Sequence, residues 1–165
     1  MGMRSNLKNS HSRDIKDQLN DWYPTLNFDI VLKCWRRMNQ CLDYDHCGAH
    51  TDHVKDCIKS HKFRTLMHEC REQAESLWAS GQNSISVICI SDQGRHRSVA
   101  VSSVLQSVYL LCGRDSYGPY HMSGGQWWSG ICHTCKDCKP NAYKEGMMTA
   151  WASELRGLYF SQLLG

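Results

Sequence analysis

The chain has 165 residues, of which 41% are hydrophobic and 21% charged, a globular composition that excludes a wholly disordered protein. Its formal net charge of +3 permits a nucleic-acid partner but does not require one. No apolar run is long enough to span a membrane, and the N-terminus lacks the apolar core of a signal peptide. We therefore expect an intracellular, cytoplasmic protein with no membrane partner.

The N-terminal part of the chain predicts a tail, a short helix and a first strand. Residues 1–13 are polar, basic and without periodicity, which is typical of a disordered tail. Residues 14–22 favour a short helix that Pro24 ends. The apolar run at residues 28–33 predicts the first strand.

A polar stretch and an amphipathic segment follow. Residues 34–53 show no clear period and predict a loop that crosses the edge of the sheet where ligands bind, so Arg36, Arg37 and His50 are secondary ligand candidates. Residues 61–80 predict a helix, because their apolar residues recur at spacings of three and four: Phe63, Leu66, Met67, Cys70, Ala74, Leu77 and Trp78.

The centre of the sequence reads as a strand, a loop and a helix. Residues 85–90 are apolar and rich in β-branched side chains, which predicts a buried central strand. A polar turn follows, and Gly113 is placed to end the next helix. The apolar residues of that helix are Val101, Val104, Leu105, Val108 and Leu111.

The turn between this strand and helix predicts a phosphate-binding loop. The N-terminus of a helix favours a bound anion through its free amides and its dipole. Gly94 would let the backbone approach an oxyanion, and Arg97 could hold a phosphate with two hydrogen bonds. The predicted ligand-binding residues are Ser91, Asp92, Gly94, Arg95, His96, Arg97 and Ser98.

These residues also carry a family resemblance. Gly94-x-His96-Arg97-Ser98, after a hydrophobic strand and before a helix, resembles the loop of the RapZ C-terminal domain, and the similarity extends weakly over residues 28–121. The chain resembles a eukaryotic-type member with a cysteine-rich extension. The resemblance implies a small α/β domain that binds a phosphorylated amino sugar or a nucleotide-like ligand and acts as an adaptor.

The same loop is similar to that of the cysteine-dependent phosphatases, whose signature is Cys-x5-Arg followed by Ser or Thr. Ser91 stands where both families have a cysteine, which is the nucleophile in the phosphatases, and Gln93 replaces a second glycine of the bacterial RapZ members. A serine hydroxyl is a weak nucleophile unless a base activates it, and Cys89 lies too early, within the strand. The loop therefore predicts binding rather than catalysis.

Beyond Gly113 we expect a third strand at residues 116–122, limited to an edge by its Gly-Pro pair. Residues 14–122 would form one α/β domain with a small, mainly parallel sheet and flanking helices. Residues 123–165 would form a cysteine-rich segment that packs on the same domain and ends in a helix over residues 141–164.

The cysteine-rich segment predicts a structural zinc site. Cys132, Cys135 and Cys138 form two overlapping C-x2-C units, and zinc takes four such ligands in a tetrahedron. His121 is the first choice for the fourth ligand and Cys112 the second. Because the three cysteines lie beyond the third strand, we expect metal removal to destabilise the fold without directly emptying the phosphate loop.

Three functions are compatible with these patterns. The first is a non-catalytic sensor or adaptor that binds a phosphorylated small molecule. The second is a phosphatase-like enzyme or pseudophosphatase with Ser91 at the nucleophile position. The third is a zinc-stabilised nucleic-acid-binding module, with RNA or a protein as partner. The patterns leave a homo-oligomer open.

Overall fold

A two-stranded parallel sheet lies at the centre of the fold. The computed structural model describes residues 15, 17–19, 21, 23–34, 46, 48, 50–91, 96–120, 135–138, 149–150 and 153. Strand β1 (Ile30–Lys33) pairs in parallel with β2 (Val87–Ile90), and Ile30 faces Val87 in the register. Both strands lie within the ranges predicted for them. The small parallel sheet and its flanking helices confirm the α/β class.

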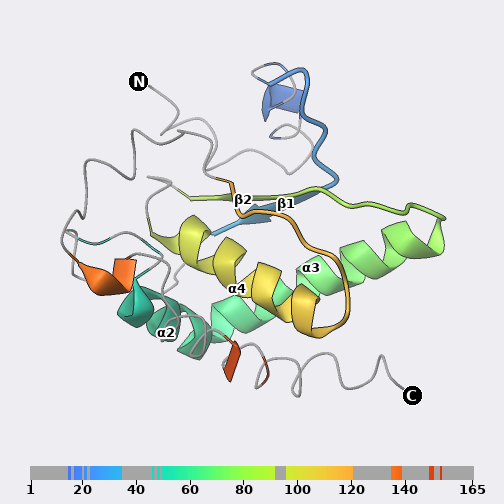
Figure 1. The fold of residues 1–165 in the computed structure, drawn as a ribbon. Coiled ribbons are helices and arrows are strands. Elements are labelled where there is room, and N and C mark those ends of the chain that lie inside the picture. Colours follow the sequence, from blue (N-terminus) through green and yellow to red (C-terminus); the bar gives the residue numbers. More distant parts are fainter. Residues whose placement is uncertain are drawn as a thin grey trace.

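Helices cover both faces of the sheet (Figure 1). Helices α2 (Thr51–Lys59), α3 (His61–Ala79) and α4 (Arg97–Leu111) lie on one side. On the other side, an N-terminal segment that is helical at its described residues packs Ile15 and Leu19 against Val31 and Ile88. The alternation of side chains along each strand divides the core in this way, because neighbouring residues of a strand point to opposite faces.

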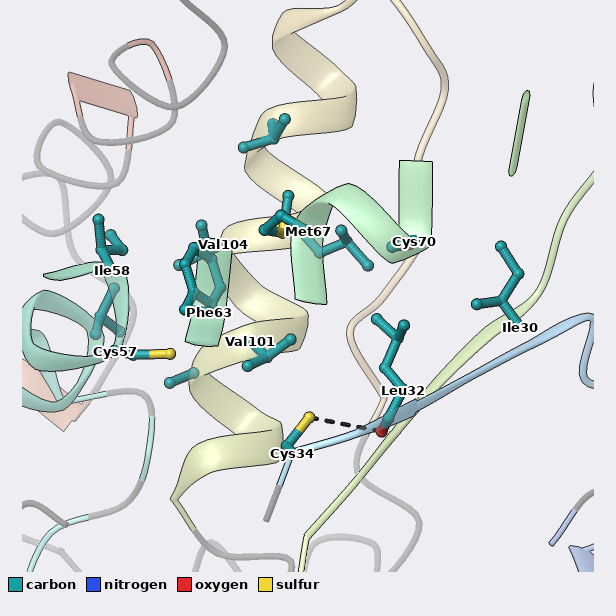
Figure 2. Packing of buried hydrophobic residues seen from close by; sticks show 14 of the residues in the cluster. Ile30, Leu32, Cys34, Cys57, Ile58, Phe63, Met67, Cys70, Val101 and Val104 are labelled. Atoms are coloured by element: carbon teal, nitrogen blue, oxygen red, sulfur yellow. Dashed lines mark hydrogen bonds between the residues drawn. The ribbon is translucent and has the colours of Figure 1, made fainter. Parts of the chain in front are cut away.

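The larger core lies between the sheet and the three helices. Figure 2 shows Phe63 of α3 between Ile58 of α2 and Val104 of α4, and Phe63 is fully buried. The buried face of α3 consists of Phe63, Met67, Cys70 and Ala74, the spacing from which this helix was predicted. The apolar side of α4 packs against this face, and its buried residues include Val101, Val104 and Val108.

Glycine ends both long helices. Gly81 follows α3 with φ of 92°, and Gly113 follows α4 with φ of 72°. This left-handed conformation favours glycine and lets amides beyond the helix bond its last carbonyl groups. In α4 the Gly113 amide donates to Leu110 O at 3.0 Å and the Arg114 amide to Tyr109 O at 3.0 Å. The predicted end of the α4 helix at Gly113 is confirmed.

Helix α2 corrects the prediction of a loop that extends to residue 53. The helix begins at Thr51, because the His50 side chain caps it: Nδ1 of His50 accepts a hydrogen bond from the Asp52 amide at 3.2 Å. Val54, Cys57 and Ile58 are buried at spacings of three and four. These three residues were the helical signal in the sequence.

The predicted third strand is wrong over residues 116–120, which have no regular secondary structure. Gly118 adopts φ of 101°, far from the extended values of a strand, and Pro119 has no amide to donate to a neighbouring strand. Instead, the Gln106 side chain of α4 donates a hydrogen bond to Gly118 O. Figure 1 shows this segment, coloured orange, running back past α4 towards the sheet.

The described residues near the two ends of the chain are helical where helices were predicted. Residues 15, 17–19 and 21 are helical, as are 149, 150 and 153 near the C-terminus. The predicted tail at residues 1–13 lies outside the described residues. No described helix combines the length and the apolar character that crossing a membrane requires.

Several thiols lie in the core and stay protonated there. The described cysteines form no disulfide. Burial raises the pKa of Cys70 to about 12 and that of Cys57 still further. A hydrogen bond with Cys34, together with burial, raises the pKa of Cys89. These side chains behave as small hydrophobic groups, as expected for Cys57, Cys70 and Cys89.

Candidate functional site

The candidate site lies at the edge of the sheet where both strands end. Because β1 and β2 are parallel, their carboxyl ends share this edge, and the Cys34 amide donates to Ile90 O at 2.7 Å there. The start of α4 comes directly after β2, and the segment before α2 comes after β1. Polar groups distant in the sequence therefore meet at one place, as in other open α/β sheets.

Two serine hydroxyls lie at the two ends of the predicted phosphate loop. Ser91 follows β2 directly, and Ser98 is buried in the first turn of α4. Their oxygen atoms are 2.9 Å apart, so the hydroxyls share a hydrogen bond. The predicted ligand residues Asp92, Gly94 and Arg95 lie outside the described residues.

The first turn of α4 presents backbone amides and a cation. The first helical hydrogen bond runs from the Ala100 amide to His96 O at 2.9 Å, so the amides of Ser98 and Val99 precede it. Arg97 is the first helical residue and is half-buried. A helix N-terminus of this kind attracts an anion through its amides and its dipole.

His96 also contacts the segment before α2. Its Nε2 atom lies 2.7 Å from the His46 carbonyl oxygen, and because a carbonyl only accepts, Nε2 donates this bond. The His96 ring also lies against that of His53 in α2, with centroids 4.9 Å apart. His96 was predicted as a ligand residue, and here one ring nitrogen joins α4 to the segment before α2.

Gly48 permits this close approach. A Cβ atom at residue 48 would lie 1.8 Å from the His96 carbonyl oxygen, and carbon atoms in proteins do not come that near. Its φ lies outside the left-handed region, so proximity alone requires a glycine here. The backbone at residue 48 therefore lies directly on the backbone of His96.

A group of potential metal ligands lies beside this contact. His46, His50 and Cys135 each offer one ligand atom, and these atoms lie within 4.8 Å of one another. Cys135 directly precedes the short 3-10 helix η1 (Lys136–Cys138), which Figure 1 shows in orange near the start of α2. A group of imidazole nitrogens and a thiol is suited to a metal ion.

The group overlaps only partly with the predicted ligand set. Cys135 belongs to it, and the Cys138 sulfur lies 3.5 Å from His46 Nδ1. His121 and Cys132 lie outside the described residues. Cys112 follows the last residue of α4, about 22 Å along the helix from the His96 end, and is too distant to be a ligand of the same ion.

The two histidines were not predicted as metal ligands, although the sequence carries a signal for them. His46 and His50 have the H-x3-H spacing of many zinc sites. His50 was considered only as a ligand candidate in a loop, together with Arg36 and Arg37, and those two arginines lie outside the described residues. The C-x2-C unit that lies beside the histidines is distant from them in the sequence, so the sequence alone did not indicate that they belong to one group.

Carboxylates surround His50. Its Nδ1 atom lies 3.8 Å from an Asp52 oxygen, and its Nε2 atom 3.9 Å from an Asp137 oxygen. The His46 and His50 rings are stacked at a tilt of 32°, with centroids 4.3 Å apart. Negative charge next to two imidazoles favours a cation at this position.

Searches against protein-family models, curated proteins and solved structures found no match. The functional argument therefore depends on the residues and their geometry.

Proposed function

We propose that the protein is a non-catalytic ligand-binding domain that recognises a phosphorylated small molecule at the N-terminus of α4. The observation that carries the proposal is the arrangement of Ser91, Arg97 and Ser98 at the carboxyl edge of the parallel strands. The ligand would be an amino-sugar phosphate or a nucleotide-like molecule, the class that the resemblance to the RapZ C-terminal domain implies.

Three features support an anion at this position. The amides of Ser98 and Val99 precede the first helical hydrogen bond of α4. The guanidinium group of Arg97 belongs to the same turn and can bind two phosphate oxygens at once. The hydroxyls of Ser91 and Ser98 share a hydrogen bond of 2.9 Å, so the two ends of the loop meet at the start of α4.

The residue at the nucleophile position favours binding over catalysis. Ser91 carries a hydroxyl rather than a thiol, and this hydroxyl shares a hydrogen bond with the Ser98 hydroxyl. A hydroxyl does not take up a proton as a general base does, so this contact does not activate Ser91. A sensor or adaptor role follows, in which the bound ligand alters the contacts of the domain with a partner.

The metal ion of the His46, His50 and Cys135 group would be zinc. Nitrogen and sulfur donors in one group are the set that Zn²⁺ prefers, whereas Mg²⁺ and Ca²⁺ take oxygen donors. The role would be structural, because the group joins two segments that are distant in the sequence. Zinc would thereby order the cysteine-rich segment against the domain.

Calorimetry on the full chain tests the ligand proposal. The probes are an amino-sugar phosphate, the same sugar without phosphate, and a nucleoside monophosphate. We expect binding of a phosphorylated probe only, and a loss of about 1.5–3 kcal/mol on Arg97→Ala, the range for a hydrogen bond to a charged group. Arg64→Ala is the matched control, because Arg64 is an exposed arginine of α3.

Equal losses for Arg97→Ala and Arg64→Ala would contradict the proposal, since only net charge would then matter. Hydrolysis of an aryl phosphate that disappears in Ser91→Ala would show a phosphatase instead. Tight binding of RNA that weakens steeply with salt would favour the nucleic-acid function.

A further inference from the structure

We propose that His46, His50, Cys135 and Cys138 together bind one zinc ion, and that this ion controls ligand binding by fixing His96 at the start of α4. The inference rests on the proposed function, because it concerns the regulation of that same site. It replaces the predicted ligands His121 and Cys132 with two histidines that precede α2.

The spacing of the donors suits a tetrahedral site. With Zn–S and Zn–N bonds of about 2.3 and 2.0–2.1 Å, two ligands of one tetrahedral ion lie roughly 3.5 Å apart. The Cys138 sulfur and His46 Nδ1 are 3.5 Å apart, and the ligand atoms of His46, His50 and Cys135 lie within 4.8 Å of one another. Cys138 and His50 are the buried members, with 3% and 8% of their surfaces exposed, so they would shield the ion from water on one side.

Binding of a metal ion would displace protons from the donor atoms of the site. Cys138 and His46 share one proton in their hydrogen bond, and a metal ion bound by both atoms would displace it. Nδ1 of His50 already accepts a hydrogen bond from the Asp52 amide at 3.2 Å, so the ring proton lies on Nε2, and an ion that binds Nε2 would displace this proton.

The segment that holds the histidines also holds His96. The His46 carbonyl accepts the hydrogen bond of the His96 ring at 2.7 Å, and Gly48 lies against the His96 backbone. His96 is in turn the residue that caps α4 and accepts its first helical hydrogen bond. A shift of the segment on metal loss would therefore move the N-terminus of α4, where the phosphate is proposed to bind.

This connection differs from the expectation that the metal and the phosphate loop are independent. That expectation followed from the position of the cysteines late in the sequence. In the fold, Cys135 and Cys138 lie beside His46, which contacts the cap of α4. Metal removal should therefore weaken ligand binding as well as stability.

Elemental analysis of the purified full chain tests the ligand set. We expect one zinc per chain, and its loss in His46→Ala, Cys135→Ser and Cys138→Ser, whereas Cys112→Ser and His68→Ala keep it. Cys112 lies at the far end of α4, and His68 is an exposed histidine of α3. Cobalt substitution adds a second readout, because thiolate-to-cobalt absorption falls when one of two sulfur ligands is removed.

Metal-free wild-type protein would overturn the site. Zinc retained in Cys138→Ser but lost in Asp137→Asn would assign the fourth position to Asp137 and overturn the proposed set. Zinc retained in His46→Ala but lost in Cys132→Ser would restore the ligands predicted from the cysteine spacing. If a variant fails to fold, the wild-type protein is used in its place. Its zinc is removed with a chelator and then returned, and the fold is followed by circular dichroism.

Calorimetry with the amino-sugar phosphate tests the control of ligand binding. We expect at least ten-fold weaker binding to chelated protein that remains folded, and recovery when zinc is returned. His96→Phe should keep its zinc and bind the probe weakly in both states, because it lacks the bond to His46. Equal affinity with and without zinc would refute the control but leave the proposed function intact. No binding of the probe to zinc-loaded protein would refute the proposed function while the zinc content still reports on the metal site.

Discussion

Replacement of Gly48 by alanine tests the contact between the segment before α2 and the start of α4. The new Cβ would lie 1.8 Å from the His96 carbonyl oxygen, and real contacts of this kind require at least 3.0 Å. The atom in the way belongs to the backbone of a helix cap, so no side chain can rotate to make room. Either the segment or the start of α4 must move.

The cost follows from these distances. Overpacking at a tight contact costs about 1–3 kcal/mol. A glycine-to-alanine change also stiffens the unfolded chain and returns about 0.4–1 kcal/mol. We expect a net loss of about 1–2 kcal/mol in the free energy of unfolding, measured by urea denaturation, together with lower zinc content and weaker binding of the amino-sugar phosphate.

Gly113→Ala is the matched control for Gly48→Ala. Gly113 has φ of 72° and open space around its Cα, so alanine there costs about 1–2 kcal/mol through the left-handed backbone alone. Both variants should lose similar stability, but only Gly48→Ala should disturb the site. The reasoning would be refuted if Gly48→Ala kept wild-type stability, zinc content and probe affinity.

Three further predictions concern the fold. Phe63→Ala should lower the free energy of unfolding by about 3–5 kcal/mol in urea titrations. Tyr117 is 86% exposed, so Tyr117→Ala should change this free energy by less than about 0.5 kcal/mol. Similar losses for the two variants would contradict the core position of Phe63. Asp29→Ala should cost about 1–3 kcal/mol of unfolding free energy in the same assay, because the Asp29 carboxylate accepts hydrogen bonds from the Ser86 amide at 2.7 Å and the Ser86 hydroxyl at 2.8 Å. An unchanged urea midpoint would argue against these bonds. The folded pKa of Cys70, about 12, exceeds its ordinary value of 9.0, so its contribution to stability is complete below pH 9 and is lost as the pH rises towards 12. Cys70→Ala should therefore flatten the alkaline part of the pH profile of the urea midpoint, and an unchanged slope would contradict this assignment.

The parts of the fold with a strong local pattern could be predicted from the sequence. The buried positions of α3, from Phe63 to Ala74, repeat at helical spacing, and the apolar run that includes β2 has no competing signal. Helix α2 was missed because it is short and its apolar positions are only Val54, Cys57 and Ile58, among charged residues. The strand predicted at 116–120 failed because Gly118 and Pro119 prevent regular pairing.

The candidate metal group could be predicted only in part, for a different reason. The C-x2-C unit at Cys135 is a local signal, and Cys135 does belong to a described group that could hold a metal ion. The histidine that contacts Cys138 lies 92 residues earlier in the chain. No local spacing relates two residues so far apart in the sequence, and only the fold brings them together.

The buried thiols of the core make the unfolding of this protein measurable element by element. Three of them lie on different elements: Cys34 follows β1, Cys57 belongs to α2 and Cys70 to α3. A thiol-specific reagent attacks the thiolate, so each cysteine reacts only when local opening exposes it to solvent. Labelling followed by mass spectrometry would therefore give an opening rate for each element and show whether the sheet and the helices open together or in sequence.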